Sequence, residues 1–290
     1  MTEVSLLPAE AVYVSAAELR TLLASPQLVL FDASIERVER PDGTAGYENG
    51  RQKFIREGHI PGALHADLCK DFSDPEAPFS FTRPSVEKLA DALQKHGVDD
   101  RSEIVVYDAL NGVWAARLWW VLKSAGLRRI RILNGGLTEW RRQGGDIAFG
   151  EAAPREADRK PGLAVDPRLF SDLEDVLPVV DNEAGARLVC ALRQPDYDAG
   201  HIPGSLSMPY QAILSDDGLV DPVRTQVAAR ALGVNSADRL ILYCGGGVNA
   251  AGLGAALRAI GYDNVSVYDG SLSEWKADPS RPFVRTKTPQ

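Results

Sequence analysis

The run LILYCGGGVNAA at residues 240–251 joins a short apolar segment to three glycines through one cysteine, Cys244. The apolar residues predict a short buried strand, and the Ala- and Leu-rich segment that continues to Ile260 predicts a helix. A thiol between a glycine turn and a helix N-terminus lies among backbone N–H groups, which favour the thiolate. Because glycine has no side chain, several N–H groups of such a turn can point at one sulfur atom. The run therefore favours a reactive cysteine, and a buried thiol beside an ordinary turn is the alternative.

Three segments of the chain occur twice, in the same order and at a nearly constant offset. The pairs are GHIPGA (58–63) and GHIPGS (200–205), IVVYD (104–108) and LILYC (240–244), and NGGLTEW (134–140) and DGSLSEW (269–275). So long a period indicates duplicated domains rather than a solenoid. Asp108 stands in the first copy where Cys244 stands in the second, so the fold itself does not require the thiol.

Each half alternates short apolar runs with helical patterns. The predicted strands of the first half are 29–31, 104–107 and 130–133, and its predicted helices are 85–96, 115–125 and 137–143. The second half repeats this pattern from about Arg187, with a helix near 223–232. Alternating strands and helices predict an α/β fold, in which each half has a mainly parallel sheet flanked by helices on both faces. Ligands of such folds bind beyond the C-terminal ends of the strands, where Cys244 falls.

Composition marks one internal boundary. Residues 151–163 are rich in charged side chains, contain two prolines and lack apolar periodicity, so they predict a linker. We therefore expect a first domain at 1–150, a linker at 151–163 and a second domain at 164–290. The tail 278–290 carries three prolines and predicts an extended arm.

The bulk composition excludes several classes of protein. The chain has 290 residues and a net charge of −8, which argues against nucleic-acid binding and against an anionic membrane surface. The N-terminus lacks the pattern of a signal peptide, and no stretch is long enough to span a membrane. Three cysteines are too few and too scattered for a disulfide framework, so a cytoplasmic location is expected. The four histidines and the cysteines have no metal-ligand spacing, and no metal site is predicted.

The paired GHIPG boxes and the paired G-x-x-x-E-W boxes resemble those of the tandem-domain rhodaneses, the thiosulfate and 3-mercaptopyruvate sulfurtransferases. The resemblance extends from about Val14 to Trp275. It implies two rhodanese-like domains and one catalytic cysteine at the start of the second active-site loop, which is Cys244 here. The first half, with Asp108 at that position, is then catalytically silent.

Sulfur transfer needs a nucleophile that takes a sulfur atom, holds it as a persulfide and passes it on. A thiolate suits this step, and the reaction needs no cofactor or metal. Backbone N–H groups of the loop can stabilise the anionic persulfide, and the residues concerned are Gly245, Gly246, Gly247, Val248, Asn249 and Ala250. The expected partners are a small-molecule sulfur donor and an acceptor, which is a thiol, a thioredoxin-like protein or cyanide.

Two other functions fit parts of the pattern. The loop is similar to the Cys-x5-Arg loop of cysteine phosphatases, but Ala250 occupies the position of the phosphate-binding arginine. A duplicated rhodanese can also act as a non-catalytic scaffold or as a protein-to-protein sulfur relay. Sulfur transfer through Cys244 remains the main hypothesis.

The loop sequence gives a weaker indication of which compound is the sulfur donor. The loop CGGGVN lacks the cation that goes with thiosulfate in the family, which favours 3-mercaptopyruvate, but Gly246 also replaces the loop serine of the CGSGVT enzymes. Arg193 matches the family's Asp-x-Arg arginine and is the candidate for holding a donor carboxylate. Its alternative is an ion pair with Asp196 or Asp198. Only a short segment follows it, unlike the long loop of the mercaptopyruvate enzymes.

The remaining candidates have an equally plausible structural interpretation. Trp114 and Tyr210 match family positions that line the cleft, although core packing explains them as well. His59 could act as an acid or base beside Glu48, but its copy His201 indicates a shared structural task. Cys69 could act as a resolving thiol, and Cys190, in a strand-like run, is expected to be buried. Trp119 and Trp120 lie in an apolar helical run and are expected in the core.

Overall fold

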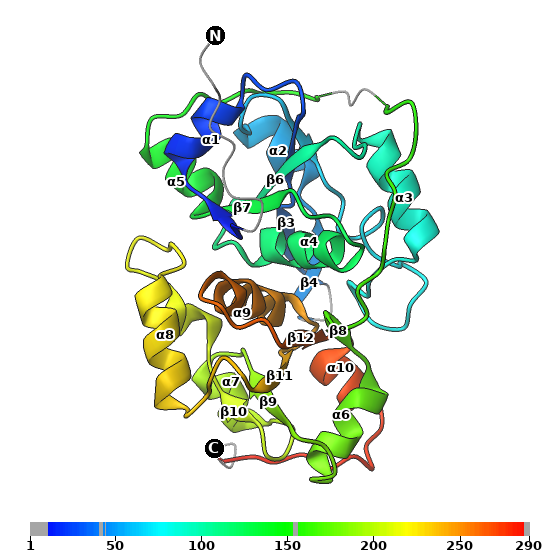
Figure 1. Cartoon of the computed structure of the whole chain (residues 1–290), viewed down its shortest axis with the longest axis vertical. Helices are drawn as coiled ribbons and strands as arrows, with labels where there is room; N and C mark the ends of the chain where they lie inside the picture. Colours follow the sequence, from blue (N-terminus) through cyan, green and yellow to red (C-terminus); the bar gives the residue numbers. More distant parts are fainter. Residues whose placement is uncertain (1–10, 41–42, 44, 153–155, 287–290) are drawn as a thin grey trace.

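The computed structural model describes residues 11–40, 43, 45–152 and 156–286 (Figure 1). The first half of the described chain contains a parallel sheet of five strands in the order β1-β7-β6-β2-β5. Its strands are β1 (Tyr13–Val14), β2 (Leu28–Asp32), β5 (Ala63–His65), β6 (Glu103–Tyr107) and β7 (Ile130–Leu133). Its helices are α1 (Ala16–Leu22), α2 (Arg51–Glu57), α3 (Val86–Lys95), α4 (Val113–Ser124) and α5 (Gly136–Arg142).

The second half repeats this topology. Its parallel sheet has the order β10-β9-β11-β12-β8. Read from the β8 edge, this order matches the first sheet strand for strand, with β8 in the place of β1 and β11 in the place of β6. The strands are β8 (Phe170–Ser171), β9 (Ala186–Cys190), β10 (Leu206–Ser207), β11 (Arg239–Tyr243) and β12 (Val265–Tyr268). The helices are α6 (Leu173–Val180), α7 (Gln194–Ala199), the 3-10 helix Tyr210–Ile213, α8 (Pro222–Ala231), α9 (Val248–Ala259) and α10 (Ser271–Trp275). The α/β fold with two helix-flanked parallel sheets is thus confirmed, whereas the exact domain and linker limits stay predictions.

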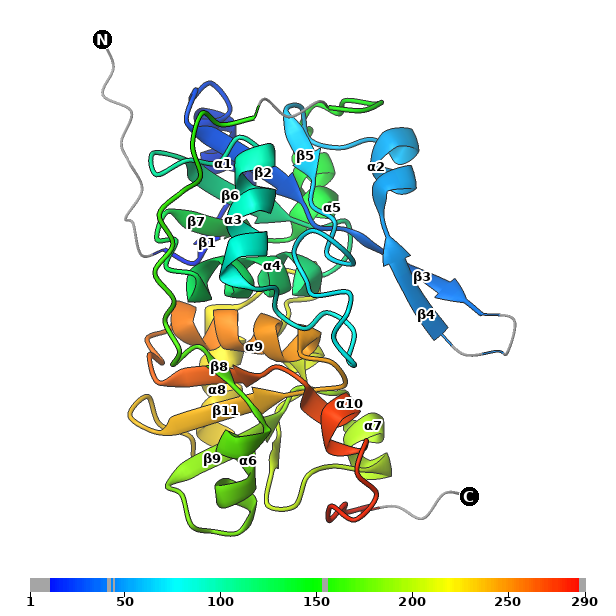
Figure 2. The ribbon, with the colours of Figure 1, turned by 90° about the vertical axis from the view of Figure 1, so that its right-hand side faces the viewer.

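The two sheets enclose a shared central core. Alternate residues of β6 point to opposite faces: Ile104 and Val106 pack with α3 and α4, and Val105 and Tyr107 pack with α1 and α5. The same division holds for β11, whose Leu240 and Leu242 join the central core. Helices α4 and α9 therefore lie against each other between the sheets (Figures 1 and 2). This position explains why α4 is buried on nearly all sides, with Trp119 and Trp120 in the core as expected.

The contact between α4 and α9 is close because a glycine removes one side chain. A Cβ atom on Gly254 would lie 2.7 Å from the ring of Trp120, so no larger residue fits there. The indole N–H of Trp120 crosses to the second half and donates to the carbonyl oxygen of Leu169 at 2.7 Å. The close packing of Trp120 on Gly254 and its hydrogen bond to Leu169 thus determine how the two halves pack together.

A buried ion pair also links the halves. The guanidinium of Arg117, on α4, pairs with Asp269 after β12, and the two side chains are 1% and 4% exposed. Arg83, also from the first half, reaches the same carboxylate at 3.2 Å and pairs with the exposed Asp172 at 2.8 Å. Both arginines lie over the ring of Phe170. These ion pairs connect two arginines of the first half with two aspartates of the second half.

A hairpin breaks the symmetry between the halves. Strands β3 (Ile35–Glu39) and β4 (Ala45–Asn49) pair antiparallel and project from the first half (Figure 2). In the second half, β9 is followed within a few residues by α7, with no hairpin between them. We call the described residues of β3 and β4 the arm. The sequence analysis did not predict it.

The tail of the chain is partly extended, as expected. Val284 forms an antiparallel bridge with His201, and Ala148 forms the same bridge with His59 in the first half. Among the described residues, no helix has both the length and the apolar character needed to cross a membrane.

The buried pair makes a prediction about stability. Asp269→Asn leaves the Arg117 guanidinium buried without its counter-charge, so the free energy of unfolding should fall by about 3 kcal/mol. Equilibrium urea unfolding measures this change. Asp172→Asn is the matched control, because its exposed pair with Arg83 should contribute less than about 1 kcal/mol. Equal urea midpoints for the two variants would contradict the assigned role of Asp269.

Candidate active site

Cys244 lies directly after β11, at the C-terminal end of a central strand. Its backbone N–H donates to Ser271 Oγ at 3.2 Å, and its carbonyl oxygen accepts the N–H of Leu272 at 3.0 Å. The carbonyl oxygen of Gly245 accepts two hydrogen bonds from Ser273, one from the backbone at 3.0 Å and one from the hydroxyl at 2.8 Å. The start of α10 thus holds the beginning of the cysteine loop.

Gly247 ends the loop and precedes α9. Its φ of 77° lies in the left-handed region, and a Cβ atom there would be 3.0 Å from both Arg117 Nη1 and the carbonyl oxygen of Asp269. Both facts require glycine. Gly245 and Gly246 differ, because no described atom lies within ordinary contact of a Cβ at Gly245 and only atoms at 3.9 Å or more lie near one at Gly246.

The matching loop of the first half holds an anion. The carboxylate of Asp108 accepts four backbone N–H groups at 2.8–3.0 Å, and the donors are Leu110, Gly112, Trp114 and Ala115. Burial raises the pKa of the Asp108 carboxyl, and these four hydrogen bonds act in the opposite direction. Gly112, like Gly247, has a left-handed φ and precedes its helix. The loop therefore has the geometry of an anion cradle.

In the second half the cradle has no side-chain carboxylate. Gly247 and Asn249 correspond to the donors Gly112 and Trp114, and Ala250 corresponds to Ala115. The N–H groups of the first turn of a helix have no acceptor within the helix. An anion attached to the sulfur of Cys244 could take the place that the carboxylate of Asp108 takes in the first half.

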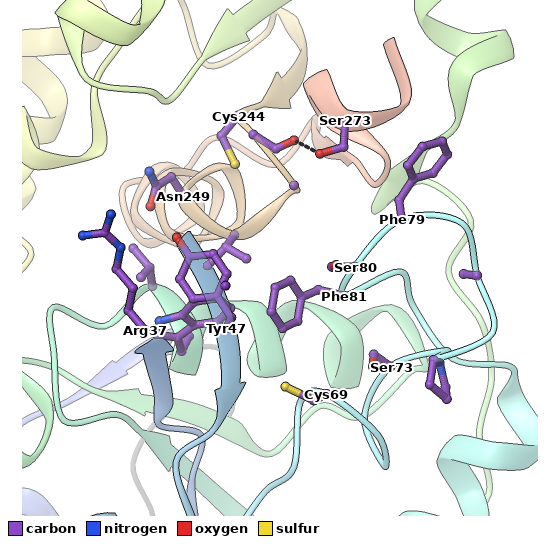
Figure 3. Close-up of a pocket in the computed structure, with 18 of the residues that line it drawn as sticks. Arg37, Tyr47, Cys69, Ser73, Phe79, Ser80, Phe81, Cys244, Asn249 and Ser273 are labelled. Carbon is purple, nitrogen blue, oxygen red and sulfur yellow. Dashed lines mark hydrogen bonds between the residues drawn. The ribbon is translucent and has the colours of Figure 1, made fainter. Parts of the chain in front are cut away.

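Cys244 opens into a pocket of about 810 Å³ between the two halves (Figure 3). The second half contributes Cys244, Gly245, Gly246, Val248, Asn249, Leu192 and Ser273. The first half contributes the arm, the segment around residues 73–81, and part of its own loop, Leu110, Asn111, Val113 and Trp114. The sulfur of Cys244 faces the side from which Tyr47 and Phe81 project (Figure 3).

Three aromatic rings form one wall of this pocket. Tyr47 packs edge-on against Trp114 with centroids 5.3 Å apart, and Phe81 packs edge-on against both, at 6.0 Å from Tyr47 and 4.9 Å from Trp114. Such edge-to-face contacts are favourable and fix ring positions. Phe81 also has a left-handed φ of 65°, and its carbonyl oxygen accepts a hydrogen bond from Arg117.

The comparisons with known proteins agree with this arrangement. A family model for the rhodanese-like domain matches residues 15–143 and 181–278. The chain belongs to the rhodanese family. It is 33% identical to a Mycobacterium tuberculosis protein named putative thiosulfate sulfurtransferase SseB, over 94% of this chain and 97% of that one. It is 30% identical to 3-mercaptopyruvate sulfurtransferase of Escherichia coli, over 95% and 98%. The crystal structure of SseA from Escherichia coli covers 90% of this chain and 98% of its own, with a TM-score of 0.79 at 29% identity.

The structure brings some of the expected residues of this rhodanese together. Trp114 lines the pocket with Cys244 and with most of the predicted loop. Gly247 and Ala250 support the loop and do not line the pocket, and Ala250 is fully buried. Tyr210 is buried outside the lining, where its hydroxyl donates to the carbonyl oxygen of Asn111 at 2.7 Å. It therefore positions the first-half loop, and a role for Tyr210 in binding substrate stays a prediction.

Arg193 does not reach the pocket. It precedes α7 with a side chain that is 67% exposed, and its Nε donates to Asp196 Oδ2 at 2.8 Å. The alternative of an ion pair with Asp196 is what the structure has, because helix geometry brings residues three apart together. Donor binding by Arg193 has no support from this position.

His59 lies away from the cysteine. Its Nδ1 donates to the carbonyl oxygen of Phe54 at 3.0 Å, and its ring stacks on that of Phe54 with centroids 3.7 Å apart. His201 repeats both contacts with Tyr197, at 2.9 Å and 3.8 Å. The two histidines share a structural task, as their repeated boxes indicated, and His59 does not line the pocket as an acid or base.

Cys69 does line the pocket, across from Cys244 (Figure 3). Burial, together with the nearby carboxylates of Asp67 and Glu48, raises the pKa of its thiol to about 11. A thiol of that kind is a poor nucleophile near neutral pH, which disfavours a resolving role. Cys190 is buried, as expected.

The sequence analysis missed the charged residues of the pocket. Among the described lining residues these are Arg37 and Arg40 on or beside the arm, and Asp74. Pro41, Asp42 and Gly43 are typical turn residues between two strand-like segments and could have indicated the hairpin. No histidine lines the pocket in the described part of the chain, and no cluster of three His, Cys, Asp or Glu residues there could hold a metal.

The two kinds of loop glycine make a prediction. Gly247→Ala forces a side chain into a left-handed backbone and against Arg117, so stability should fall by about 1–2 kcal/mol. The shifted loop should also slow sulfur transfer by more than about tenfold. Gly246→Ala, in open space, is the control and should keep its thermal midpoint. Calorimetry and steady-state rates measure both, and a tolerated Gly247→Ala would contradict the loop geometry.

Proposed function

We propose that this rhodanese transfers sulfur from a small anionic donor to a thiol or to cyanide through a persulfide on Cys244. One observation carries the proposal. The loop around Cys244 repeats a loop whose first-half copy binds a carboxylate with four backbone N–H groups. The same cradle suits the anionic outer sulfur of a persulfide. The sulfurtransferase names of relatives that align over nearly the whole chain agree with it.

With thiosulfate, the reaction has two balanced steps. The thiolate of Cys244 attacks the outer sulfur, the S–S bond of the donor breaks, and its electron pair leaves with sulfite. The product is a Cys244 persulfide anion. In the second step a cyanide carbon or a thiolate attacks the outer sulfur, the persulfide bond breaks, and the electron pair returns to Cys244. The acceptor leaves as thiocyanate or as a new persulfide.

The pocket supports thiosulfate as the donor over 3-mercaptopyruvate. Removing sulfur from 3-mercaptopyruvate leaves an enolate that must gain a proton, whereas sulfite leaves thiosulfate without one. A histidine would suit that proton transfer, and the described pocket lining contains none. The argument for 3-mercaptopyruvate from a loop without a cation also weakens, because Arg37 and Arg40 bring positive charge from outside the loop.

We further propose a reducing, cytoplasmic setting. All three cysteines carry free thiols, which fits a compartment without disulfide formation. The acceptor is then a small thiol or a thioredoxin-like protein, with cyanide as the convenient acceptor for assays.

Intact-mass measurement tests the persulfide. After treatment with thiosulfate, the protein should gain the mass of one sulfur atom, and dithiothreitol should remove it. Cys244→Ser should abolish the gain, whereas Cys69→Ser is the matched control and should keep it. A wild-type protein that gains no sulfur from thiosulfate or from 3-mercaptopyruvate would instead indicate a scaffold.

Steady-state kinetics with the two donors test the choice between them. The kcat/KM for thiosulfate should exceed that for 3-mercaptopyruvate by more than about tenfold, which corresponds to about 1.4 kcal/mol of transition-state stabilisation. Cyanide serves as the acceptor in both series. A higher kcat/KM for 3-mercaptopyruvate would contradict the assignment of thiosulfate as the donor. It would not contradict the proposed persulfide on Cys244.

A further inference from the structure

We propose that Arg37 is the anion-binding residue of the donor site, assisted by Arg40, and that the arm of the first half thereby determines donor specificity. The inference rests on the proposed function. Both candidate donors are anions, and a pocket that binds them needs positive charge or aligned N–H groups. The loop of Cys244 supplies N–H groups and has no charged side chain between Cys244 and Ala250.

Arg37 is a cation without an acidic partner among the described residues. Two nearby cations are paired: Lys53 lies 3.4 Å from Glu36, and Arg51 lies 2.8 Å from Glu151. Arg37 and Arg40 have no ion pair in the described part of the chain, and both line the pocket. An unpaired guanidinium beside a reactive thiol is available to a ligand.

The register of the arm turns Arg37 toward the pocket. Arg37 pairs with Tyr47 across the two antiparallel strands, so the two side chains lie on the same face. Glu36, which pairs with Lys53, lies on the opposite face. Because Tyr47 packs against Trp114 and Phe81, the face that carries Arg37 is held at the pocket. Figure 3 shows Arg37 beside Tyr47, with Asn249 of the cysteine helix nearby.

Arg40 reaches the same pocket by a different route. A Cβ atom on Gly46 would lie 2.8 Å from Nε of Arg40, so the arginine side chain lies directly over this glycine. The arm and Arg40, which follows its first strand, thus bring two guanidinium groups to one cavity.

The chemistry of a guanidinium suits the donor. Its planar N–H groups can hold two oxygens of a sulfonate-like or carboxylate group at once, which orients the ligand as well as attracting it. With its oxygens at the arm, thiosulfate has its outer sulfur free to face Cys244. Arg37 binds the donor and takes no part in breaking the S–S bond.

Single-turnover kinetics of persulfide formation test the assignment. Arg37→Ala should lower the second-order rate constant for thiosulfate by about tenfold, Arg37→Glu should lower it further, and Arg37→Lys should recover part of the loss. The rate at saturating thiosulfate should change little. Arg56→Ala, an exposed arginine of α2 outside the pocket lining, is the matched control. Thermal midpoints of all variants should match that of the wild type, because Arg37 is exposed.

The salt dependence gives a second readout. Rising ionic strength should slow persulfide formation in the wild type more steeply than in Arg37→Ala, because the variant has lost a charge that attracts the anion. A structural role of Arg37 would leave this slope unchanged.

Three outcomes would overturn the inference. If Arg37→Ala forms persulfide as fast as Arg56→Ala does, Arg37 does not bind the donor, while the persulfide on the wild type keeps the proposed function. If the loss appears only when preloaded enzyme is discharged by 2-mercaptoethanesulfonate, and not by neutral 2-mercaptoethanol, the anion recognised belongs to the acceptor. If the wild type itself forms no persulfide, the proposed function fails first and the inference fails with it.

Discussion

The site depends on the contact between α4 and α9, with the buried pair of Arg117 and Asp269 at one end of it. Cys244 belongs to one half of the chain and most of its pocket to the other, so the pocket exists only while the halves hold one orientation. Arg117 connects the two sides directly, because it donates both to Asp269 and to the carbonyl oxygen of Phe81 in the aromatic wall. Its Nη1 has no acceptor in the part of the chain that the structure describes, and it lies against Gly247 of the cysteine loop. A shift of this guanidinium would therefore move the wall and the loop together.

The first-half copy of the loop forms part of the pocket around Cys244. In one copy the loop holds a carboxylate from its own chain, so its N–H groups are satisfied without any ligand. This loop lines the pocket, and the hydroxyl of Tyr210, from the other half, donates to the carbonyl oxygen of Asn111 in the loop. Asp108 thus has a structural function in the first half, whose loop keeps the geometry of the loop around Cys244.

Much of the fold could be predicted from the sequence because its central elements carry strong local signals. The strands β6, β7 and β11 are mainly apolar, each with a single charged residue, and α3 begins at a Ser85 cap that the sequence displays. The edge strands β1 and β8 are two residues long, so no periodicity could reveal them. Cys244 was predictable because the repeat supplied its own comparison in Asp108.

The direction of surface side chains was not predictable in the same way. The sequence places Arg193 near the end of a strand. Only the structure shows that α7 begins directly after it and that its guanidinium forms an ion pair with Asp196. Arg37 was missed for the opposite reason. It is far from Cys244 in sequence, on a hairpin that the repeat does not contain, and nothing local connects it with the loop.

This separation has a consequence for specificity. The backbone path of the cysteine loop is constrained by the left-handed glycine at 247 and by the hydrogen bonds from α10, although a side chain can be added at 245 or 246. The arm is exposed, is fastened mainly by Tyr47, and can exchange its charged residues without disturbing the core. Chemistry and recognition therefore sit on parts of the chain with different tolerance to change. If Arg37 binds the donor as proposed, a change of donor needs substitutions in the arm, while the loop proposed to form the persulfide remains as it is.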